Sequence, residues 1–358
     1  MADIQLNNSM VEIRELNTKD YEELASFNAN FPGDGRTKED WLTRFQHWWE
    51  DNPAYDDKWI RGFLLIADGK IVGWVGSFPT LFKAGENIVK AFNGTSWRVL
   101  EPFRKYSIDL WTKNREVSKH FISFNTTPTE AVIKMITRLG YFKYPWGGEK
   151  ESYYLYKPNK YIQAILPPTL HWLSPLMSAF LILYQKVKIK LVKTNLTIKL
   201  LDINIAEIDE LWIRTSNRFE FTNVRDNLSI QWYAEDKILL GIFQGEKLTA
   251  MAILDLRKNL KYDNFDLTLV DYWMDYEVSR EYILSAIVKF CIKYAQENEI
   301  SRLRFPHFSL GYSDTYKKIG LLNKKDDHPG YIRIPDFLKI SLTNENSYFT
   351  LLQGDYGV

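Results

Sequence analysis

The spacing of apolar and polar residues predicts a chain of mixed α and β structure. Residues 11–16 alternate apolar and polar side chains, as a half-buried strand does. Residues 19–30 and 38–50 carry helical spacing. Thr18 and Thr37 stand at the starts of these two segments, and we expect them to act as N-caps because a threonine hydroxyl can accept from a free backbone N–H of the first turn.

A hairpin and a further helix are predicted in the same half of the chain. Asp68-Gly69 separates two apolar runs, and both residue types tolerate the positive φ of a type I′ turn. Gly140 follows a helical pattern over residues 129–139, where glycine commonly ends a helix. The strands predicted around these features are 60–67, 71–82, 91–100 and 121–124.

A second cycle of elements follows residue 196. Its predicted strands are 197–201, 238–243, 248–256, 267–274 and 302–305, and its predicted helices are 205–215, 227–235, 281–297 and 315–319. The order of elements repeats, whereas the residues do not. We therefore predict an α/β protein with mixed sheets and two domains, 1–157 and 196–358, joined by a connector at 158–195.

The connector does not continue the order of strands and helices that is predicted before and after it. It contains four prolines, and lysines accumulate toward its end. We interpret it as an ordered link packed on both domains. The alternative is a weak peripheral contact of residues 171–193 with an anionic membrane, because apolar residues beside lysines suit such a surface. Its longest apolar stretch, 173–184, is far shorter than the ~20 residues that span a bilayer.

Composition narrows the classes of function. The 358 residues carry a formal net charge of +1, which gives no support to nucleic-acid binding. Cys291 is the single cysteine, so an intramolecular disulfide is excluded and a reducing, cytoplasmic location is expected. With five scattered histidines, the sequence offers no basis for a metal site. Aromatic residues make up 15% of the chain, which we interpret as a bulky core; the alternative is a platform for a sugar or a nucleotide, since aromatic faces stack on both.

Four runs carry a resemblance to a known family. They are Gln46-His47-Trp48-Trp49-Glu50-Asp51-Asn52-Pro53, the hairpin around Ile71-Val72-Gly73, Trp97-Arg98-Val99-Leu100-Glu101-Pro102-Phe103-Arg104 and Arg138-Leu139-Gly140-Tyr141. Their order and spacing resemble the GNAT superfamily of acyltransferases, especially those of polysaccharide biosynthesis. The resemblance covers most of residues 11–157 and, less closely, 196–340. It implies two GNAT-like domains in tandem, each a splayed, mostly antiparallel sheet flanked by helices.

The resemblance implies an acyl-CoA co-substrate bound by the first domain. In that fold the pantetheine arm lies in a gap between two central strands and pairs with exposed backbone groups, here those of Trp97, Arg98 and Val99. The next turn would hold the pyrophosphate, but it lacks the usual glycines, so Arg104 and Lys105 would bind phosphate by charge. The full set of cofactor-binding candidates is Trp97, Arg98, Val99, Arg104, Lys105, Tyr106, Ser107, Asn125, Thr127 and Tyr141.

Catalysis of acyl transfer needs a neutral amine, a stabilised oxyanion and a proton for the leaving thiolate. The family's tyrosine acid is replaced by Ile136 in the first domain, whereas Tyr316 keeps it in the second. We interpret His47, between aromatic residues on a helix, as a core histidine rather than a base. The catalytic candidates are Asn93, Glu101, Asn125 and Tyr316.

The second domain is expected to close the acceptor site without binding CoA, because its corresponding loop, residues 275–280, is acidic and lacks glycine. The substrate-binding candidates are Asp34, Thr95, Asp271, Trp273, His307 and Asp355. The implied acceptor is an amino sugar, dTDP- or UDP-linked, for surface polysaccharide. Two alternatives stay open: an aminoacyl transferase acting on a cell-wall precursor, and a degenerate pair of domains that binds without turnover.

Overall fold

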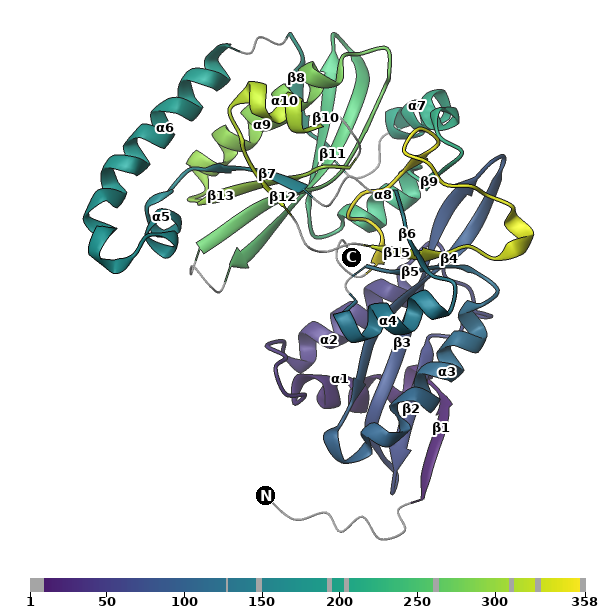
Figure 1. Ribbon diagram of the computed structural model, residues 1–358. Helices are drawn as coiled ribbons and strands as arrows, with labels where there is room; N and C mark the ends of the chain where they lie inside the picture. The colour runs from purple at the N-terminus through teal and green to yellow at the C-terminus, as the bar shows by residue number, and fades with distance from the viewer. Residues whose placement is uncertain are drawn as a thin grey trace.

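The computed structural model describes residues 10–126, 128–145, 150–191, 195–202, 206–259, 264–308, 312–325 and 330–354. Two lobes are visible, each built on one twisted sheet with helices packed against it (Figure 1). This is the predicted fold class, two mixed α/β sheets flanked by helices. No helix of the described residues combines the length and the apolar character needed to cross a bilayer.

The first sheet holds most strands of the N-terminal half. Along the sheet the order is β1 (Val11–Glu15), β2 (Gly62–Ala67), β3 (Lys70–Ala84), β4 (Asn87–Val99), β5 (Ile122–Asn125), β15 (Tyr331–Arg333) and β6 (Phe142–Lys143). Two short strands, β9 (Phe221–Asn223) and β16 (Ser347–Tyr348), extend it beside β3. Its helices are α1 (Tyr21–Ala29), α2 (Lys38–Phe45), α3 (Ser107–Ser118) and α4 (Glu130–Arg138). The β4–β5 pair is parallel, in a sheet that is otherwise mainly antiparallel.

The second sheet repeats this arrangement. Its order is β14 (Leu322–Lys325), β7 (Lys150–Leu155), β13 (Arg302–Pro306), β12 (Asn264–Met274), β11 (Lys247–Asn259), β10 (Ile238–Gln244) and β8 (Thr197–Leu200). The helices around it are α5 (Asn159–Ile165), α6 (Ser174–Leu191), α7 (Ala206–Thr215), α8 (Asn227–Ala234), α9 (Arg280–Glu297) and α10 (Tyr312–Ile319). Here β12 and β13 are the parallel pair.

The two sheets exchange strands. β7 belongs to the N-terminal half of the chain but pairs with β13 and β14 of the second sheet. β15 comes from the C-terminal half and lies between β5 and β6 of the first sheet. The predicted domain limits at 157 and 196 stay a prediction, and each sheet contains at least one strand from the other half of the chain.

Local signals explain several element boundaries. Thr37 is confirmed as an N-cap: its hydroxyl accepts from the backbone N–H of Asp40 at 3.1 Å. Thr18 is not a cap, because residues 18–20 form a 3-10 turn and the N-cap is Asn17, whose backbone N–H donates to Asp20. Gly140 ends α4 with φ +85°.

The connector is mostly helical. α5 and a 3-10 turn at Pro168–Leu173 lead into α6, an 18-residue helix. The main packing partners of α6 are α5 and α10, both of the second lobe. Figure 1 shows α6 along the outer edge of that lobe.

A core of aromatic side chains runs through both lobes. Trp48 of the first lobe stacks on Phe78 with 5.6 Å between ring centroids, and Phe78 contacts Trp232 of the second lobe at 6.3 Å. Trp232 also donates its indole N–H to the backbone oxygen of His47 at 2.7 Å. The high aromatic content therefore fills a continuous interior, as the composition suggested.

A substitution in β15 tests whether the exchanged strand supports the first sheet. Ile332 is fully buried among Phe124, Tyr144 and Phe349. We expect Ile332→Ala to lower the free energy of unfolding by about 2–5 kcal/mol, since it leaves a cavity in a packed core. Phe337→Ala, at a nearby side chain that is 69% exposed, is the matched control and should change little. Urea unfolding checks both, and equal small effects would contradict a supporting role for β15.

Candidate functional site

The strands β4 and β5 separate part-way along their length. They pair from Ala91 with Ile122 to Asn93 with Phe124, where the recorded pairing ends. β4 nevertheless continues to Val99, and β5 ends at Asn125. The edge of β4 after Asn93 therefore presents backbone groups that β5 does not use, which is the arrangement that accepts an added strand or an extended ligand.

A β-bulge lies in the same stretch of β4. Gly76 of β3 is opposite Thr95 and Trp74 is opposite Arg98, so Ser96 and Trp97 together face Val75. Ser96 has φ +53°. This left-handed backbone conformation is unfavourable for any residue that has a side chain. The bulge aims neighbouring side chains differently: Trp97 contacts Trp111 of α3, whereas Arg98 lies over Trp41 of α2.

A cavity of about 210 Å³ lies at this separation. It is lined by Val75, Gly94, Thr95, Ser96, Trp97, Trp111, Asn114, Asn125, Thr126, Pro128, Thr129 and Val132. Three predicted site residues, Thr95, Trp97 and Asn125, are thus brought together. Within the described residues, the indole N–H of Trp97 and the amide oxygen of Asn114 are buried in the wall without a hydrogen-bond partner.

An ion pair lies over the other face of β4. Arg98 donates to the buried carboxylate of Asp34 at 2.5 Å, and the backbone N–H of Arg36 donates to it at 2.9 Å. Burial opposes the charged form, but these hydrogen bonds outweigh it and lower the pKa of Asp34. Arg98, which was predicted to bind the cofactor, and Asp34, which was predicted to bind the acceptor, therefore form one ion pair.

A second hollow of about 820 Å³ lies between the lobes. α2 contributes Arg44 and the following turn contributes His47, while Glu235 and Arg257 come from the second lobe. His47 is stacked on Trp232 with 4.9 Å between centroids, and its Nδ1 lies 2.7 Å from Glu235. Burial lowers the pKa of His47, although Glu235 opposes the shift. His47 is therefore not simply a core residue, as the sequence suggested, because it also lines this groove.

The fold can now be compared with solved structures, although no family model and no curated protein matches the sequence. A conserved protein of unknown function from Enterococcus faecalis V583, described as a probable N-acyltransferase, aligns with a TM-score of 0.59 at 9% identity, over 91% of this chain and 73% of its own. A GCN5-related N-acetyltransferase from Kribbella flavida aligns at 0.54 and 11% identity, over 91% and 71% of the two chains. The chain has the GNAT fold.

N-myristoyltransferase from Saccharomyces cerevisiae, solved with bound myristoyl-CoA and inhibitors, also aligns, with a TM-score of 0.56 at 15% identity over 97% of this chain and 86% of its own. These identities are low enough that the likeness concerns the fold alone. The structural neighbours carry the names of acyl-transferring enzymes.

The turn after β4 is a 3-10 helix, Glu101–Tyr106. Its charged side chains point to solvent: Arg104 lies 3.8 Å from Glu101, and Lys105 lies 4.9 Å from the ring centre of Tyr106. None of these residues lines the cavity at β4. α3 follows at Ser107, and the side chain of its N-cap, Tyr106, accepts no hydrogen bond from the backbone of the first turn.

Asn93 is fully buried and holds the C-terminal segment in place. Its amide nitrogen donates to Thr80 at 2.8 Å and to the backbone oxygen of Phe78 at 3.3 Å. Its side-chain oxygen accepts from the backbone N–H of Gly354 at 3.0 Å. A Cβ on Gly354 would lie 2.2 Å from the hydroxyl of Thr126, so the end of this segment touches the cavity wall. The sequence led us to predict a catalytic role for Asn93. Its contact with Gly354, 261 residues away, could not be predicted from local sequence.

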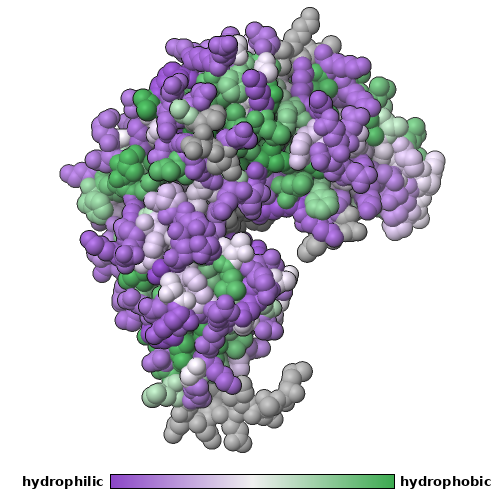
Figure 2. All heavy atoms as spheres, turned by 180° about the vertical axis from the view of Figure 1, so that it is seen from behind, coloured by the Kyte–Doolittle hydropathy of each residue, from purple (hydrophilic) through white to green (hydrophobic). Residues whose placement is uncertain are grey.

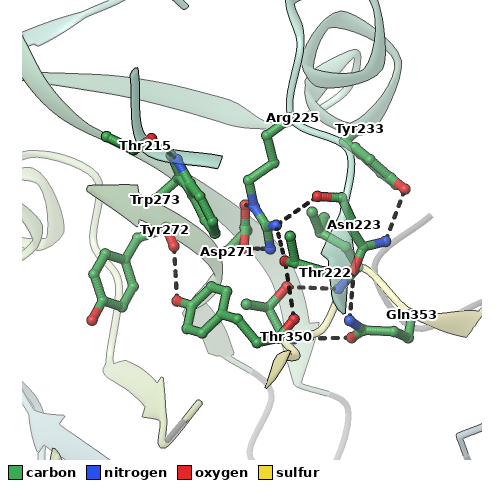
Figure 3. A network of polar contacts seen from close by, with 12 residues as sticks. Thr215, Thr222, Asn223, Arg225, Tyr233, Asp271, Tyr272, Trp273, Thr350 and Gln353 are labelled. Carbon is green, nitrogen blue, oxygen red and sulfur yellow. Dashed lines mark hydrogen bonds and ion pairs between the residues drawn. The ribbon is translucent and has the colours of Figure 1, made fainter. Parts of the chain in front are cut away.

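Asp271 and Trp273 lie inside a buried polar network (Figure 3). Arg225 donates two hydrogen bonds to Asp271, both at 2.9 Å, and further ones to Thr222 and the backbone of Asn223. Trp273 covers the guanidinium at 4.7 Å and donates to Thr215. Both predicted acceptor residues are therefore engaged in the core, and their role with a substrate stays a prediction.

Tyr316 and His307 are also interior residues of the second lobe. Tyr316 is fully buried 5.3 Å from the ring of His307, and burial raises its pKa well above the usual range. His307 contacts the hydroxyls of Ser152 and Ser313. In the first lobe, Tyr141 is buried with its hydroxyl 2.7 Å from Ser123. Val99 is buried too, and Thr127 and Asp355 lie outside the described residues.

Metal binding gains no support from the side chains in view. Across the ranges that the structure describes, no three or more His, Cys, Asp or Glu residues are grouped so that they could hold a metal ion.

Neutralising Asp271, the partner of Arg225 in the buried ion pair, tests whether this carboxylate has a structural role or a substrate-binding role. Asp271→Asn leaves the charge of Arg225 uncompensated in the core, and we expect a loss of about 3–5 kcal/mol in unfolding free energy. Glu277→Gln, at a carboxylate that is 86% exposed, is the control and should stay within about 0.5 kcal/mol of wild type. Urea denaturation measures both. An Asp271 variant of near-normal stability would favour a substrate role instead.

His307 predicts a pH dependence of stability. Burial, with help from Lys150, lowers its pKa from 6.5 to about 4. Between these values the unfolded chain binds a proton at His307 and the folded chain does not, so stability falls as the pH falls through this window. Urea midpoints measured across the window should show a shallower slope for His307→Gln than for wild type. Parallel slopes would mean that His307 does not contribute to the pH dependence.

Proposed function

We propose that the protein is an N-acyltransferase that moves an acyl group from acyl-CoA to the amine of a nucleotide-linked amino sugar. The observation that carries this proposal is the separation of β4 and β5 after Asn93, with a cavity at the gap. The GNAT fold and the names of its structural neighbours support acyl transfer as the reaction class. The amino sugar, its dTDP or UDP carrier and its use in surface polysaccharide rest on the sequence resemblance, and the single cysteine fits a cytoplasmic location.

The residues at the gap fit a pantetheine arm. Pantetheine carries two amides, and the edge of β4 after Asn93 offers backbone groups that can pair with them as an added strand would. Trp97 supplies an additional donor and Asn114 an additional acceptor, and both polar atoms are buried without a partner in the described part of the chain. Leaving such atoms unpaired is costly, so a ligand that satisfies them gains affinity.

The phosphate end of CoA would be held mainly by charge. The 3-10 turn after β4 replaces a glycine-rich loop, and its Arg104 and Lys105 are exposed at the start of α3. Their present contacts, with Glu101 and with the ring of Tyr106, are at the surface and weak. The backbone N–H of Ser107, the first residue of α3, already donates to the backbone oxygen of Arg104, so the two basic side chains would carry this contact.

The acceptor would approach from the opposite face of β4. Asp34, which pairs with Arg98, would accept a hydrogen bond from the neutral amine of the acceptor, and one guanidinium nitrogen of Arg98 is buried without a partner among the described residues. The groove between the lobes begins at Arg36, two residues from Asp34, and its lining is mixed in charge. Arg44 and Arg257 are accompanied there by carboxylates, one of which, Asp255, pairs with Arg257. This arrangement supports a polar acceptor that carries an amine.

Acyl transfer requires few chemical groups from individual side chains. The amine nitrogen attacks the thioester carbon, the C–S bond breaks, and the proton lost by the nitrogen compensates the leaving thiolate. Alignment of the two reactants can supply much of the rate. Asn125 lines the cavity at the end of β5 and would donate to the carbonyl oxygen. Glu101 is 84% exposed, and Tyr316 belongs to the interior of the other lobe, so neither is assigned a step.

A degenerate pair that binds without turnover is the second candidate. Two observations favour it: the turn after β4 has no glycine, and the tyrosine at the expected acid position is fully buried in the second lobe. Transfer of an aminoacyl group to a cell-wall precursor is the other alternative, and it would not require CoA. Measuring the binding of CoA comes first because it separates these readings.

Gly94 offers a steric test of the CoA site. It lines the cavity, and a Cβ built there meets nothing within 4 Å, so a larger side chain can enter the gap without disturbing the fold. We expect wild type to bind CoA and acetyl-CoA in a calorimetric titration, and Gly94→Trp to weaken binding by about tenfold or more, or ~1.4 kcal/mol.

Gly94→Ala is the matched control for this test and should keep nearly normal affinity, because one methyl group does not fill the cavity. Unfolding curves of the three proteins should coincide. Equal CoA affinity for the tryptophan and alanine variants would refute the placement of the site. No CoA binding by wild type would remove the acyl-CoA proposal and leave the aminoacyl or degenerate alternatives.

A further inference from the structure

Helix α6 presents a stripe of large apolar side chains to solvent, although its fully buried positions are polar and Ile189 is the apolar residue that packs on the core. The exposed face carries Leu176, Phe180, Leu183, Tyr184 and Val187, whose spacing of three and four residues places them in one stripe. The buried positions on the opposite side are Ser174, Ser178 and Gln185. A surface helix of a globular protein shows the reverse arrangement.

The polar side facing inward is poorly satisfied. Ser178 donates to the backbone of Ser174 within the helix, at 2.6 Å. The hydroxyl of Ser174 and both polar atoms of the Gln185 amide are buried with no hydrogen-bond partner among the described residues. Packing against the second lobe through Ile189 therefore accounts for only part of the apolar surface of α6, and the outward stripe is left for a partner outside the chain.

Exposed apolar residues are concentrated at this place. Of the twenty large hydrophobic side chains exposed in the described part of the chain, nine lie between Ile165 and Val187. Trp172 and Phe180 are each 73% exposed. Scattered exposed apolar residues are ordinary, but a contiguous group of this kind marks an interaction surface. Figure 2, seen from behind, shows hydrophobic side chains among hydrophilic ones along the edge that holds α6.

The surroundings of this face are strongly basic. Residues 152–201 contain seven lysines and no aspartate or glutamate, in a chain whose net charge is +1. Lys186 and Lys190 are exposed and lie four residues apart beside the apolar stripe. The long apolar stems of lysines let their charges rise out of an apolar layer, which suits the boundary between hydrocarbon and headgroups.

The apolar surface continues into a groove of about 770 Å³ between α5, α6 and the outer strands of the second sheet. Leu176 and Phe180 of the stripe line this groove together with Ile165 and Met177. The groove is also lined by Lys324, by Arg302, which pairs with Asp266, and by Glu151, which pairs with Arg304. Hydrocarbon would therefore contact the groove wall along α6, with Lys324 supplying a positive charge beside it.

We propose that the outward face of α6 docks on a lipid bilayer that carries anionic headgroups. The stripe from Leu176 to Val187 enters the boundary of the hydrocarbon, Trp172 and Tyr184 lie at the level of the headgroups, and Lys186 and Lys190 pair with lipid phosphate. The helix lies along the surface and does not cross the bilayer. This docking surface is independent of the acyl-transfer reaction.

Charge decides between a membrane and a second copy of the chain. A two-fold interface sets the same patch against itself, so the lysines of residues 152–201 would face the same lysines of the partner with no acidic residue of that segment to neutralise them. Like charges brought together at a desolvated surface repel. An anionic bilayer neutralises the lysines and buries the apolar stripe at the same time.

Sedimentation of the full-length protein with vesicles tests the proposal. We expect wild type to sediment with vesicles of equal parts phosphatidylglycerol and phosphatidylcholine at low salt, and to bind vesicles of phosphatidylcholine alone much more weakly. The double variant Leu176→Glu with Phe180→Glu should lower the partition coefficient by roughly a hundredfold or more, because it removes two buried apolar side chains. Lys186→Glu with Lys190→Glu should reduce binding mainly to the anionic vesicles.

The matched control places the same acidic change elsewhere. Ile213 on α7 and Leu228 on α8 are 73% and 64% exposed, so Ile213→Glu with Leu228→Glu alters charge and apolarity equally without touching α6. This control should bind like wild type. The proposal is overturned if wild type does not sediment with anionic vesicles, if the α6 variant and the control behave alike, or if sedimentation velocity shows a dimer that the α6 variant abolishes.

Discussion

The pairing of β15 with β5 determines the shape of the whole first lobe. β15 occupies the edge of β5 that faces away from β4, through Tyr331 with Asn125 and Ile332 with Phe124. With that edge filled, β5 is fixed in position, and its separation from β4 is the remaining opening at the middle of the sheet. The candidate site is therefore built with a strand of three residues that comes from the far end of the chain. A fragment that ends at residue 157 would lack this strand and would leave β7 without its partners.

Features that depend on residues close together in the sequence could be predicted from it, whereas features that depend on distant residues could not. The cap at Thr37, the turn at Asp68 and Gly69, and the end of α4 at Gly140 each depend on neighbours within four residues, and the pattern predicted them. At Thr18 the local signal failed because Asn17 and Asp20 form a competing capping box. β15 is too short to carry an alternating pattern, and its partners lie about two hundred residues away. No local rule could have placed it in the first sheet.

Some residues of the candidate site could likewise be predicted from the sequence, and others could not. Thr95, Trp97 and Asn125 follow from the resemblance, because strand order places them at the gap, and the cavity brings them together. The pair of Asp34 with Arg98 joins a loop to a strand, and the sequence named both without linking them. Asp271 and Trp273 were chosen for their polar and aromatic character near a strand end. That character turned out to serve the interior, since a buried arginine needs a carboxylate and can use an aromatic face.

The buried pair of Arg225 and Asp271 bears on why the C-terminal segment lies where it does. Replacing a buried ion pair with apolar residues is often neutral or stabilising, so the pair does not exist for stability alone. Arg225 also donates to Thr222, which in turn donates to the backbone of Tyr348, and the guanidinium lies 5.2 Å from the ring of Tyr348.

The same network fixes the end of the described chain, because Gln353 donates to Asn223 at 2.6 Å and the backbone of Gly354 donates to Asn93. An apolar replacement would pack equally well against several positions of this segment, whereas directional hydrogen bonds accept one. Gly354 is the residue of the C-terminal segment that reaches the wall of the cavity at β4, where it is held by Asn93 and lies against Thr126.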